Sequence, residues 1–390
     1  MKILLIHDYA ELIGGAEVGA LTLRNGFRQR GHDARLFAAR TQPNPKTSIA
    51  DYTCLGTTSR FRGLLQTVNP WAYWRLKQVL ADFQPDVVHV RMFLTQLSPL
   101  ILPLLQPIPS LYHVVWYRPI CPRGSKLLPN GTPCQTAAGL ACYQNRCLPL
   151  QDWLPLMGQM QLWQRWRSAF DCIVANSYAV QQQLLAAGIS PVRVIWNGVP
   201  VLPARPPLTA PPTIAVAARL VPEKGVDVLL QAVAAISDRI PNLQVLVAGH
   251  GPQFPALQQL AHQLGIANQV TLLGHLPRAQ VEAHFAKAWV QVVPSRWAEP
   301  FGFVAPEAMM RGTAVIASHT GGLAEIVQEG TTGFLVPPGD VDALADALVR
   351  VLSDRTLAER LGAHGRERAL QHFSESVWID QFLQLYRTLG

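Results

Sequence analysis

Two carboxylates eight positions apart, Glu299 and Glu307, stand on either side of a short apolar segment that contains a glycine. A strand-like run, 290–294, precedes the first carboxylate, and a helix-like run, 306–310, contains the second. We therefore expect Glu299 in the loop after a strand and Glu307 in the first turn of the next helix. Open α/β sheets bind ligands at this carboxyl edge. The pair can bind two parts of an extended polyhydroxylated ligand, although the helix macrodipole alone explains a single such glutamate.

Cationic side chains and paired glycines follow other strand-like runs. Arg219 and Lys224 come after the run 213–217, and a guanidinium with an ammonium suits a diphosphate. Adjacent glycines let backbone N–H groups approach a phosphate where a helix begins. Such pairs occur at Gly14 and Gly15 and at Gly321 and Gly322. Each feature alone is explained by a tight turn or by solvated charge, but together they predict a site for a nucleotide diphosphate.

Short apolar runs alternate with amphipathic helical runs along the whole chain, which is the pattern of parallel, doubly wound sheets. The sequence therefore predicts an α/β protein with two Rossmann-like domains and a ligand cleft between them. A proline-rich segment, 197–212, separates the two halves and is expected to be an extended, semi-rigid linker. The expected strands are 2–7, 34–38, 86–90, 110–113 and 172–175 in the first half, and 213–217, 244–248, 270–273, 289–293 and 314–317 in the second.

The charge of the chain is shared unevenly between its halves. Residues 1–200 carry 19 Lys and Arg against 9 Asp and Glu, and the remainder brings the formal net charge to +8. A basic first half indicates an anionic partner, either a membrane surface or a phosphorylated substrate. Nucleic acid is not expected, because no helix-turn-helix, finger or RNA-binding signature accompanies the charge. The apolar start is too short for a signal peptide or a membrane span, so we expect a cytoplasmic protein.

Several longer segments resemble the retaining family-four glycosyltransferases of GT-B fold. The segments are 218–227, Gly249–Pro252, Glu299–Glu307 and 321–327, with Asn197–Val199 and Gly333–Asp340 in addition. The resemblance covers essentially the whole chain and is most specific between about 215 and 345. It implies an acceptor-binding domain at 1–196, a donor-binding domain at 213–375, and a helix at 376–390 that crosses back.

The resemblance also implies a role for each candidate residue. Arg219 and Lys224 would neutralise the donor diphosphate, helped by backbone N–H groups of Gly14, Gly15, Gly321 and Gly322. Glu307 would hold the ribose hydroxyls. The donor sugar would lie against Glu299 and the backbone of Phe301, Gly302 and Phe303. His113 matches the histidine of the first domain that lies near the reacting sugar, although a lone histidine at a strand end is often structural.

The implied reaction transfers a hexose from a UDP- or GDP-sugar to a glycan or lipid-linked hydroxyl acceptor with retention of the anomeric configuration, and needs no cofactor. Fixed cations can stabilise the charge of the departing diphosphate in place of a metal ion. Asp340 and Asp342 have the spacing of a metal-binding pair, but Asp340 is better explained as a helix N-cap. Glu299 as a covalent nucleophile is the minority mechanism. The functional alternatives are a sucrose-type synthase, a sugar-nucleotide epimerase and a non-catalytic nucleotide-sugar-binding protein.

Two features lie outside this assignment. Four of the six cysteines, Cys121, Cys134, Cys142 and Cys147, occur within one Pro- and Gly-rich insertion, 119–149. A structural zinc site is the sharper interpretation, although the gaps lack the usual Cys-x₂-Cys pairs, and a redox-labile loop or unpaired packing residues stay open. Aromatic and basic residues also mix in three segments of the first half, 60–62, 71–77 and 163–167, which suits peripheral contact with the inner face of a membrane.

Overall fold

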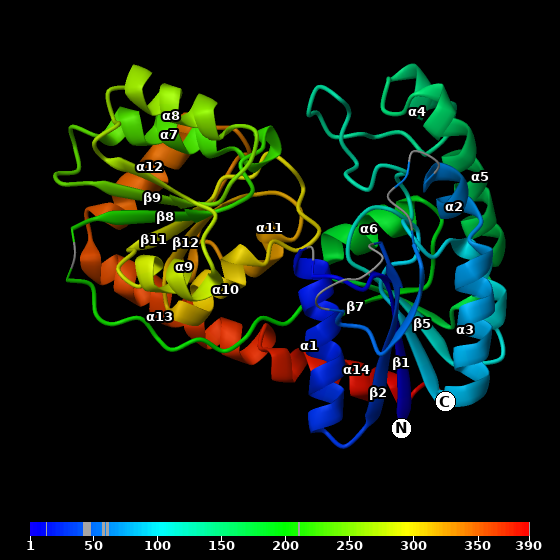
Figure 1. The fold of residues 1–390 in the computed structure, drawn as a ribbon. Helices are drawn as coiled ribbons and strands as arrows, with labels where there is room; N and C mark the ends of the chain where they lie inside the picture. The colour runs from blue at the N-terminus through cyan, green and yellow to red at the C-terminus, as the bar shows by residue number, and fades with distance from the viewer. Residues whose placement is uncertain (13, 42–47, 57–58, 60–61, 210, 390) are drawn as a thin grey trace. The chain divides into compact units, whose positions relative to one another are not determined.

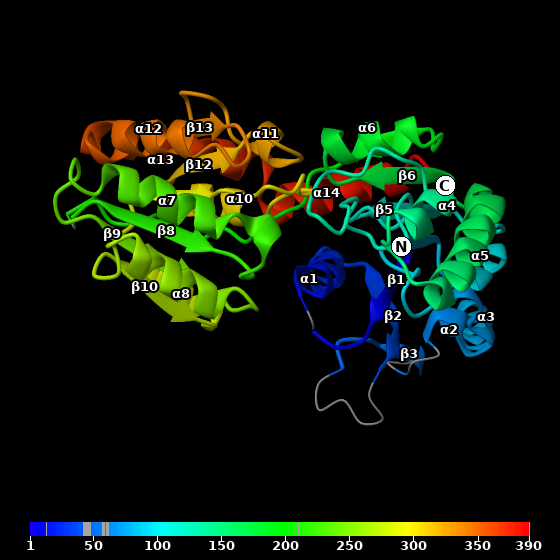
Figure 2. The ribbon, with the colours of Figure 1, turned by 90° about the horizontal axis from the view of Figure 1, so that it is seen from above.

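The computed structural model describes every residue except 13, 42–47, 57–58, 60–61, 210 and 390. The chain divides into two compact units. The N-terminal unit comprises Met1–Gly198 together with Glu375–Gly390, and the C-terminal unit comprises Val199–Ser374. Figures 1 and 2 show that each unit is a sheet covered by helices on both faces, which is the architecture expected from the alternating pattern.

The N-terminal unit is built on a seven-stranded parallel sheet of order β3-β2-β1-β4-β5-β6-β7. Six consecutive residues of β1, from Ile3 to Asp8, are buried, as expected of a strand covered on both faces. The sequence did not predict the two edge strands, β3 and β7, because each has only one buried residue and so lacks the continuous apolar run of the central strands. The strands are β1 (Lys2–Tyr9), β2 (Asp33–Arg40), β3 (Tyr52–Leu55), β4 (Val87–Val90), β5 (Ser110–Val114), β6 (Cys172–Ala175) and β7 (Val192–Val194).

The helices of the N-terminal unit divide between the two faces of this sheet. Helices α1 and α14 pack on one face over an apolar cluster, and aromatic residues of α5 and β5 fill the other. Helix α14 comes from the end of the chain and contacts α1, which is why this unit contains residues from both termini. The helices are α1 (Gly15–Gln29), α2 (Arg62–Thr67), α3 (Pro70–Phe83), α4 (Leu140–Gln144), α5 (Leu150–Trp166), α6 (Tyr178–Ala186) and α14 (Glu375–Tyr386), with short 3₁₀ turns η1 (Pro99–Leu104) and η2 (Arg167–Ala169).

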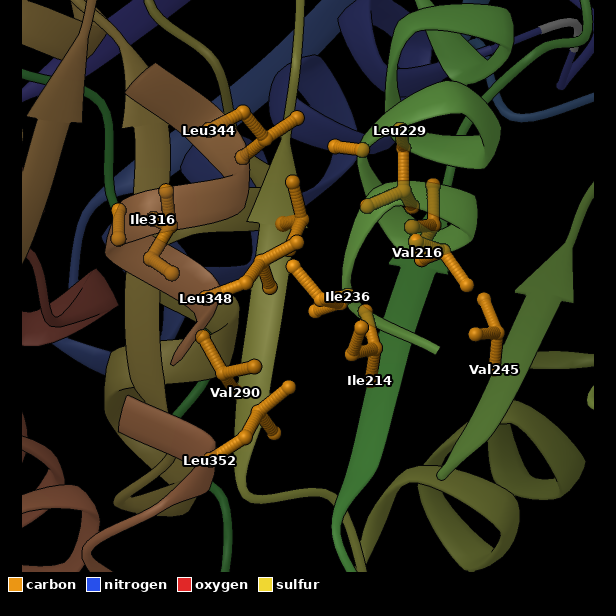
Figure 3. Close-up of a cluster of buried hydrophobic side chains, with 14 of the residues drawn as sticks. Ile214, Val216, Leu229, Ile236, Val245, Val290, Ile316, Leu344, Leu348 and Leu352 are labelled. Atoms are coloured by element: carbon orange, nitrogen blue, oxygen red, sulfur yellow. The ribbon is translucent and has the colours of Figure 1, made fainter. Parts of the chain in front are cut away.

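The C-terminal unit has a six-stranded parallel sheet of order β10-β9-β8-β11-β12-β13. Figure 3 shows alternate strand residues such as Ile214 and Val216 pointing toward Leu229 and Leu348, which belong to the helices over that face. The intervening residue, Ala215, packs on the opposite side against Phe285. The strands are β8 (Thr213–Ala217), β9 (Gln244–Ala248), β10 (Val270–Gly274), β11 (Val290–Val293), β12 (Ala314–Ser318) and β13 (Gly333–Val336).

The helices between β8 and β13 connect consecutive strands, so each begins after the carboxyl end of a strand, and the last two helices of the unit follow β13. Residues 200–209, expected as part of a linker, have no helix or strand, and Leu208 is 2% exposed. The Leu208 N–H donates to Glu359 at 3.0 Å, so this segment is fixed to the C-terminal unit. The helices are α7 (Val226–Ile236), α8 (Phe254–Gln263), α9 (Arg278–Phe285), α10 (Val304–Arg311), α11 (Leu323–Ile326), α12 (Val341–Leu352) and α13 (Arg355–His372), preceded by the 3₁₀ turn η3 (Pro222–Lys224).

Candidate donor-binding site

An ion pair joins two of the predicted site residues at the carboxyl edge of the C-terminal sheet. Lys224 ends η3, which follows β8, and Glu299 lies in the loop after β11. The Lys224 Nζ atom is 2.9 Å from Glu299 Oε1, and the two side chains are 19% and 10% exposed. The Trp297 ring lies 5.2 Å from the same Nζ atom. Lys224, which is predicted to bind the diphosphate, and Glu299, which is predicted to bind the sugar, therefore contact each other directly in this structure.

Glycines allow the loops to converge at this ion pair. Gly225 has φ +65°, and a Cβ atom there would lie 2.0 Å from the Pro294 carbonyl oxygen. Gly321 has φ +54°, and its Cβ would lie 2.4 Å from the carbonyl oxygen of Glu299. The N–H of Gly322 donates to that same oxygen at 2.8 Å. The Gly321–Gly322 turn therefore fixes the backbone of Glu299, a role that the sequence reading did not assign to it.

The segment between the two glutamates divides into core and surface. Phe301 is 1% exposed and meets the Phe303 ring edge-on at 5.3 Å, so its side chain belongs to the core. Gly302 has φ +91°, and a Cβ atom would approach Leu323 to 2.5 Å. The side chain of Phe301 is therefore unavailable to a ligand, whereas Phe303 is half-buried, and contact between a sugar and the backbone of this turn stays a prediction.

Glu307 lies in the first turn of α10, as predicted, and pairs with a cation that the sequence analysis missed. Its Oε1 atom is 3.2 Å from Arg278 Nη2, and 27% of the Glu307 side chain is exposed. Burial raises the pKa of Glu307, while Arg278 and Arg311 act in the opposite direction. Arg278 begins α9 shortly after β10. Arg278 follows the end of a strand, as Arg219 follows β8, and this position in the sequence could have identified it as a candidate.

A cavity of about 340 Å³ lies where β8, β9 and β10 end. Arg219 lines it with a side chain that is 70% exposed and pairs with Glu223 at 3.2 Å. Two histidines from the adjacent loops, His250 and His275, also line it. Gly249 lets its loop approach, because its Cβ would lie 1.8 Å from the Ala218 carbonyl oxygen. The cavity adds two imidazole rings beside Arg219, a predicted phosphate ligand, and the sequence analysis selected neither histidine.

One of the two glycine N–H groups that are predicted to bind phosphate in the N-terminal unit already takes part in a hydrogen bond. The N–H of Gly14 donates to Glu17 at 2.7 Å, and Glu17 also contacts the buried His7 at 3.1 Å. That amide already has a partner. Gly15 begins α1, and a Cβ atom there would meet no other atom within 4 Å. Open space therefore surrounds Gly15, while Gly14 serves the helix cap.

His113 lies in the core. It is 0% exposed, and its ring centroid lies 4.9 Å from Phe382 and 6.2 Å from Trp378, both on α14. Neither ring nitrogen has a hydrogen-bond partner, and burial lowers the pKa of His113 well below its usual value. The cause is its position inside β5, where side chains alternate between faces and His113 shares the α14 face with Leu111. In this arrangement the imidazole contacts no ligand-accessible surface, contrary to the position expected from the sequence.

The cysteine insertion and the acidic pair were the two candidate metal sites. Within the described residues, no group of three or more His, Cys, Asp or Glu side chains is placed to hold a metal ion. The four cysteines are free thiols, and burial raises the pKa of Cys142, with Cys121, Cys147 and Cys134 acting in the same direction. The zinc hypothesis therefore stays a prediction. Asp340 is the N-cap of α12 and accepts from the Ala343 N–H at 2.9 Å, which confirms that interpretation.

Two units that each have a parallel sheet covered by helices are the architecture of GT-B proteins. Two family models match the sequence accordingly. The model of the glycosyl transferases group 1 matches residues 203–368, and that of glycosyltransferase family 4 matches residues 13–201. The chain belongs to the family-4 glycosyltransferases of GT-B fold.

The relatives include two mycobacterial proteins. A GDP-mannose-dependent alpha-(1-6)-phosphatidylinositol monomannoside mannosyltransferase of Mycobacterium tuberculosis is 39% identical over 162 residues, which cover 40% of this chain and 42% of that protein. The alignment thus spans less than half of the relative. A phosphatidyl-myo-inositol mannosyltransferase of Mycobacterium leprae is 27% identical over 100% of this chain and 97% of its own.

Solved structures show the same fold over the full length. The sucrose-phosphate synthase of Thermosynechococcus elongatus superimposes with a TM-score of 0.75 at 25% identity, covering 100% of this chain and 98% of its own. The Anabaena protein HepE in complex with UDP gives a TM-score of 0.74 at 21% identity, with 100% of both chains covered.

Proposed function

We propose that this protein transfers a hexose from a UDP- or GDP-sugar to a hydroxyl of a glycan or lipid-linked acceptor, in polysaccharide or glycolipid synthesis. The observation that carries the proposal is the Lys224–Glu299 pair at 2.9 Å on the carboxyl edge of the C-terminal sheet. Lys224 is a ligand for a diphosphate and Glu299 for sugar hydroxyls. The GDP-mannose-dependent relative and the UDP complex of HepE support the donor class.

The chemistry follows from the charges at this edge. The bond between the anomeric carbon and the diphosphate oxygen breaks, and negative charge develops on the departing nucleoside diphosphate. Lys224 and Arg219 neutralise that charge in place, a form of preorganised electrostatic stabilisation. The acceptor oxygen bonds to the anomeric carbon from the side of the leaving group, and its proton passes to the departing phosphate. The configuration of the sugar is then retained.

Donor binding to single-residue variants tests the assignment. We expect Lys224→Ala to weaken binding of UDP- or GDP-sugars by about 10- to 100-fold, because a lost hydrogen bond between charged groups is worth about 1.5–3 kcal/mol. Glu307→Ala should weaken binding of the same donors. The matched control is Lys287→Ala, an exposed lysine of the same unit that lies outside the site. Calorimetric titration with the UDP- and GDP-sugars measures each affinity, and wild-type affinity in both site variants would falsify the assignment.

Turnover in the presence of EDTA tests the charge-neutralising role of the side chains. If Lys224 and Arg219 replace a metal ion, sugar-nucleotide hydrolysis and transfer continue at the same rate with EDTA. Loss of activity that Mg²⁺ or Mn²⁺ restores would contradict this part of the proposal. Analysis of the product anomer by NMR distinguishes retention from inversion. Formation of a sucrose-type disaccharide instead would favour the second candidate, to which the likeness to a sucrose-phosphate synthase points.

We further propose that the surface formed by α2, α3 and α5, here called the basic aromatic face, rests on an anionic membrane. Trp71 and Trp74 are 53% and 61% exposed, and Leu64 and Leu154 are 64% and 60% exposed. Residues 62–81 include three Lys or Arg and no Asp or Glu. Figures 1 and 2 both show α2, α3 and α5 on the same side of the N-terminal unit. Exposed tryptophan beside cationic side chains is the composition of interfacial segments.

Two of the three segments predicted for membrane contact need comment. Arg60 and Phe61 lie outside the described residues, so the first segment is represented only by Arg62. Trp163 is 0% exposed and donates to the Pro119 carbonyl oxygen at 3.1 Å. It is therefore a core residue, and the interpretation of 163–167 as a membrane segment was wrong for this side chain. No helix among the described residues is long and apolar enough to cross a membrane.

Vesicle sedimentation tests the membrane proposal. We expect the protein to bind phosphatidylglycerol-containing vesicles, to bind pure phosphatidylcholine weakly, and to lose binding as salt screens the charges. Trp71→Ser/Trp74→Ser should release it. The control is Tyr178→Ser/Leu185→Ser, which removes two apolar side chains exposed on α6 of the same unit. Equal release by both double variants would contradict a specific face.

A further inference from the structure

A network of charged side chains joins α9 to α10 in the C-terminal unit, and Glu307 belongs to it. Arg278 of α9 lies with its Nη2 atom 3.2 Å from Glu307 Oε1 on α10. In the opposite direction, Arg311 of α10 lies with its Nη1 atom 2.8 Å from Glu282 Oε2 on α9. Arg278 Nε is also 3.8 Å from Glu282 Oε1. Two arginines and two glutamates therefore connect the same two helices.

The Arg311 side of this network is part of the core. The side chain of Arg311 is 6% exposed, and its guanidinium lies 5.7 Å from the Phe285 ring of α9. It also contacts the amide oxygen of Gln291 on β11. Gln291 in turn donates to the Val304 carbonyl oxygen, where α10 begins, at 2.9 Å. Arg311 therefore holds both helices on the sheet, and its role is structural.

The Arg278 side of the network lies at the surface, near the candidate donor site. The side chains of Arg278 and Glu307 are 46% and 27% exposed. Solvent screens ion pairs of this kind, so they contribute little to stability. Leu276 and Val281, on either side of Arg278 in the chain, line the cavity of about 340 Å³ that Arg219 also lines. The Arg278–Glu307 pair is therefore better explained by ligand binding than by folding.

The pairing prepares the Glu307 carboxylate to accept hydrogen bonds from a ribose. An ionised carboxylate accepts through both oxygens, and its hydrogen bonds are stronger than those of the protonated acid. Burial raises the pKa of Glu307, Arg278 and Arg311 act against this rise, and Glu282 adds to it. Arg278 contacts Oε1, so the carboxylate is already ordered before the nucleoside binds, which lowers the entropic cost of binding.

We infer that Arg278 is a positioning residue for nucleoside recognition: it fixes the Glu307 carboxylate so that this group distinguishes a ribonucleotide from its deoxy form. The inference rests on the proposed function, in which Glu307 binds the ribose of the donor. It adds to that function a selectivity for ribose hydroxyls that depends on an ion pair between two helices.

A ratio of affinities tests the inference. Calorimetric titration at pH 6, 7 and 8 measures the Kd of UDP and GDP, and of the 2′-deoxy and 3′-deoxy forms of whichever binds. The ratio of the deoxy Kd to the ribose Kd reports recognition of one hydroxyl, because both ligands carry the same diphosphate. The variants are Arg278→Ala, Arg278→Lys and Glu307→Gln. The control is Arg239→Ala, an exposed arginine before β9, at the opposite edge of the same sheet.

We expect a wild-type ratio of about 10 to 100 for at least one hydroxyl, because a hydrogen bond to a charged group is lost. Glu307→Gln should bring this ratio close to 1, and Arg239→Ala should leave it unchanged. Arg278→Ala should lower it by about three- to tenfold at pH 7, the usual effect of losing the order of one side chain. Arg278→Lys should restore part of it, because lysine keeps the charge without the fork geometry.

The pH dependence of the ratio adds a second readout. Without Arg278 the pKa of Glu307 rises, so the carboxylate takes up a proton at a higher pH. The ratio of Arg278→Ala should therefore begin to fall at a higher pH than that of the wild type. Urea unfolding checks that the variant is folded, and Arg278→Gln, which keeps a polar side chain of similar length, replaces it if Arg278→Ala is unstable.

The outcomes separate this inference from the proposed function. If Arg278 were only structural, its removal would weaken binding of the ribose and deoxy forms by the same factor, and an unchanged ratio overturns the inference. Tighter binding of UDP or GDP by Arg278→Ala also overturns it, because Arg278 would then compete with the ribose for Glu307. A wild-type ratio near 1 overturns it while nucleotide binding stands. If the wild type binds neither UDP nor GDP, the proposed function fails, and the inference fails with it.

Discussion

At the scale of single residues, the structure changes the chemistry expected of His113. The sequence places this residue near the end of a strand, and family resemblance then implies contact with the reacting sugar. In the fold it packs between β5 and α14 with both ring nitrogens unpartnered. A neutral imidazole in such a place behaves as an apolar core residue with an unsatisfied polar edge.

The stability of the protein should therefore depend on pH through His113. Burial lowers the pKa of its folded form well below the usual 6.5, so the unfolded chain takes up a proton that the folded chain does not. Its contribution to stability is present above pH 6.5 and is lost as the pH falls, with a limiting slope of about 1.4 kcal/mol per pH unit. Urea unfolding of the wild type and His113→Phe at pH 7.5, 6.5 and 5.5 measures this slope.

We expect acid to destabilise His113→Phe less than the wild type. Part of the destabilisation should remain, because His89 is equally buried. The exposed His364→Phe is the control and should leave the slope unchanged. Donor hydrolysis adds a functional readout. A folded His113→Phe that retains hydrolysis supports the core role, whereas a loss of about 100-fold or more would restore the catalytic role.

At the scale of elements, the donor site depends on how closely loops approach one another. The Gly321–Gly322 turn supports Glu299 through its backbone, and a Cβ atom at Gly321 would intrude on Glu299. Gly330 has a similar positive φ of +70°, but a Cβ atom there would meet nothing within 4 Å. A substitution at either glycine introduces backbone strain, but only one at Gly321 is expected to displace the site. Comparing the two therefore distinguishes these effects.

We predict that Gly321→Ala lowers donor affinity at least tenfold, whereas Gly330→Ala leaves it unchanged. Gly330→Ala should lose about 1–2 kcal/mol of stability, because alanine is strained at positive φ. Gly321→Ala should lose more, because its Cβ atom would also meet the backbone of Glu299 at 2.4 Å. Donor titration and denaturant unfolding measure the two quantities separately. If Gly330→Ala loses as much donor affinity as Gly321→Ala, general destabilisation explains the effect and the support of Glu299 does not.

The cysteine insertion is a second element whose role can be measured. Elemental analysis of the purified protein should find one zinc per chain if Cys121, Cys134, Cys142 and Cys147 bind it, which requires the insertion to close around the metal. Cys142→Ala should then lose the zinc and lower the melting temperature, because structural zinc contributes directly to folding. Cys54→Ala, which removes a buried cysteine outside the insertion, is the control. Protein without zinc would leave the redox-labile and packing interpretations.

At the scale of the whole molecule, each unit has its own sheet and its own apolar core. Such units can unfold separately, and a ligand stabilises the unit that binds it by mass action. The charged residues predicted to bind the donor, Arg219, Lys224, Glu299 and Glu307, all belong to the C-terminal unit, whereas the N-terminal unit would contribute only backbone N–H groups of its glycine pair. Ligand binding should therefore act mainly on one unit.

We expect two calorimetric transitions, of which only one shifts when UDP or GDP is added. At a concentration 100 times the Kd the stabilisation is about 2.7 kcal/mol, or a few degrees for a unit of this size. Lys224→Ala should abolish the shift without changing the other transition. A single transition that moves as a whole would show that the two units unfold together.

Local sequence patterns were enough to predict the parallel α/β architecture, most central strands and the position of the two glutamates, because these features depend on local periodicity and on strand ends. Glu299 and Glu307 lie in the loop and first helical turn where the pattern puts them. The position of Lys224 after a strand also identified it in the sequence as a candidate cationic ligand.

The partners of these groups and the direction in which each side chain points depend on long-range packing, which the sequence patterns do not report. The Glu307–Arg278 pair joins α10 to α9, and the burial of His113 depends on α14, which lies more than 260 residues away in the chain. A cavity of about 770 Å³ between α5 and α6 likewise has a wall formed by residues of the insertion 119–149. Contacts between segments distant in sequence follow from packing, and local periodicity carries no information about them.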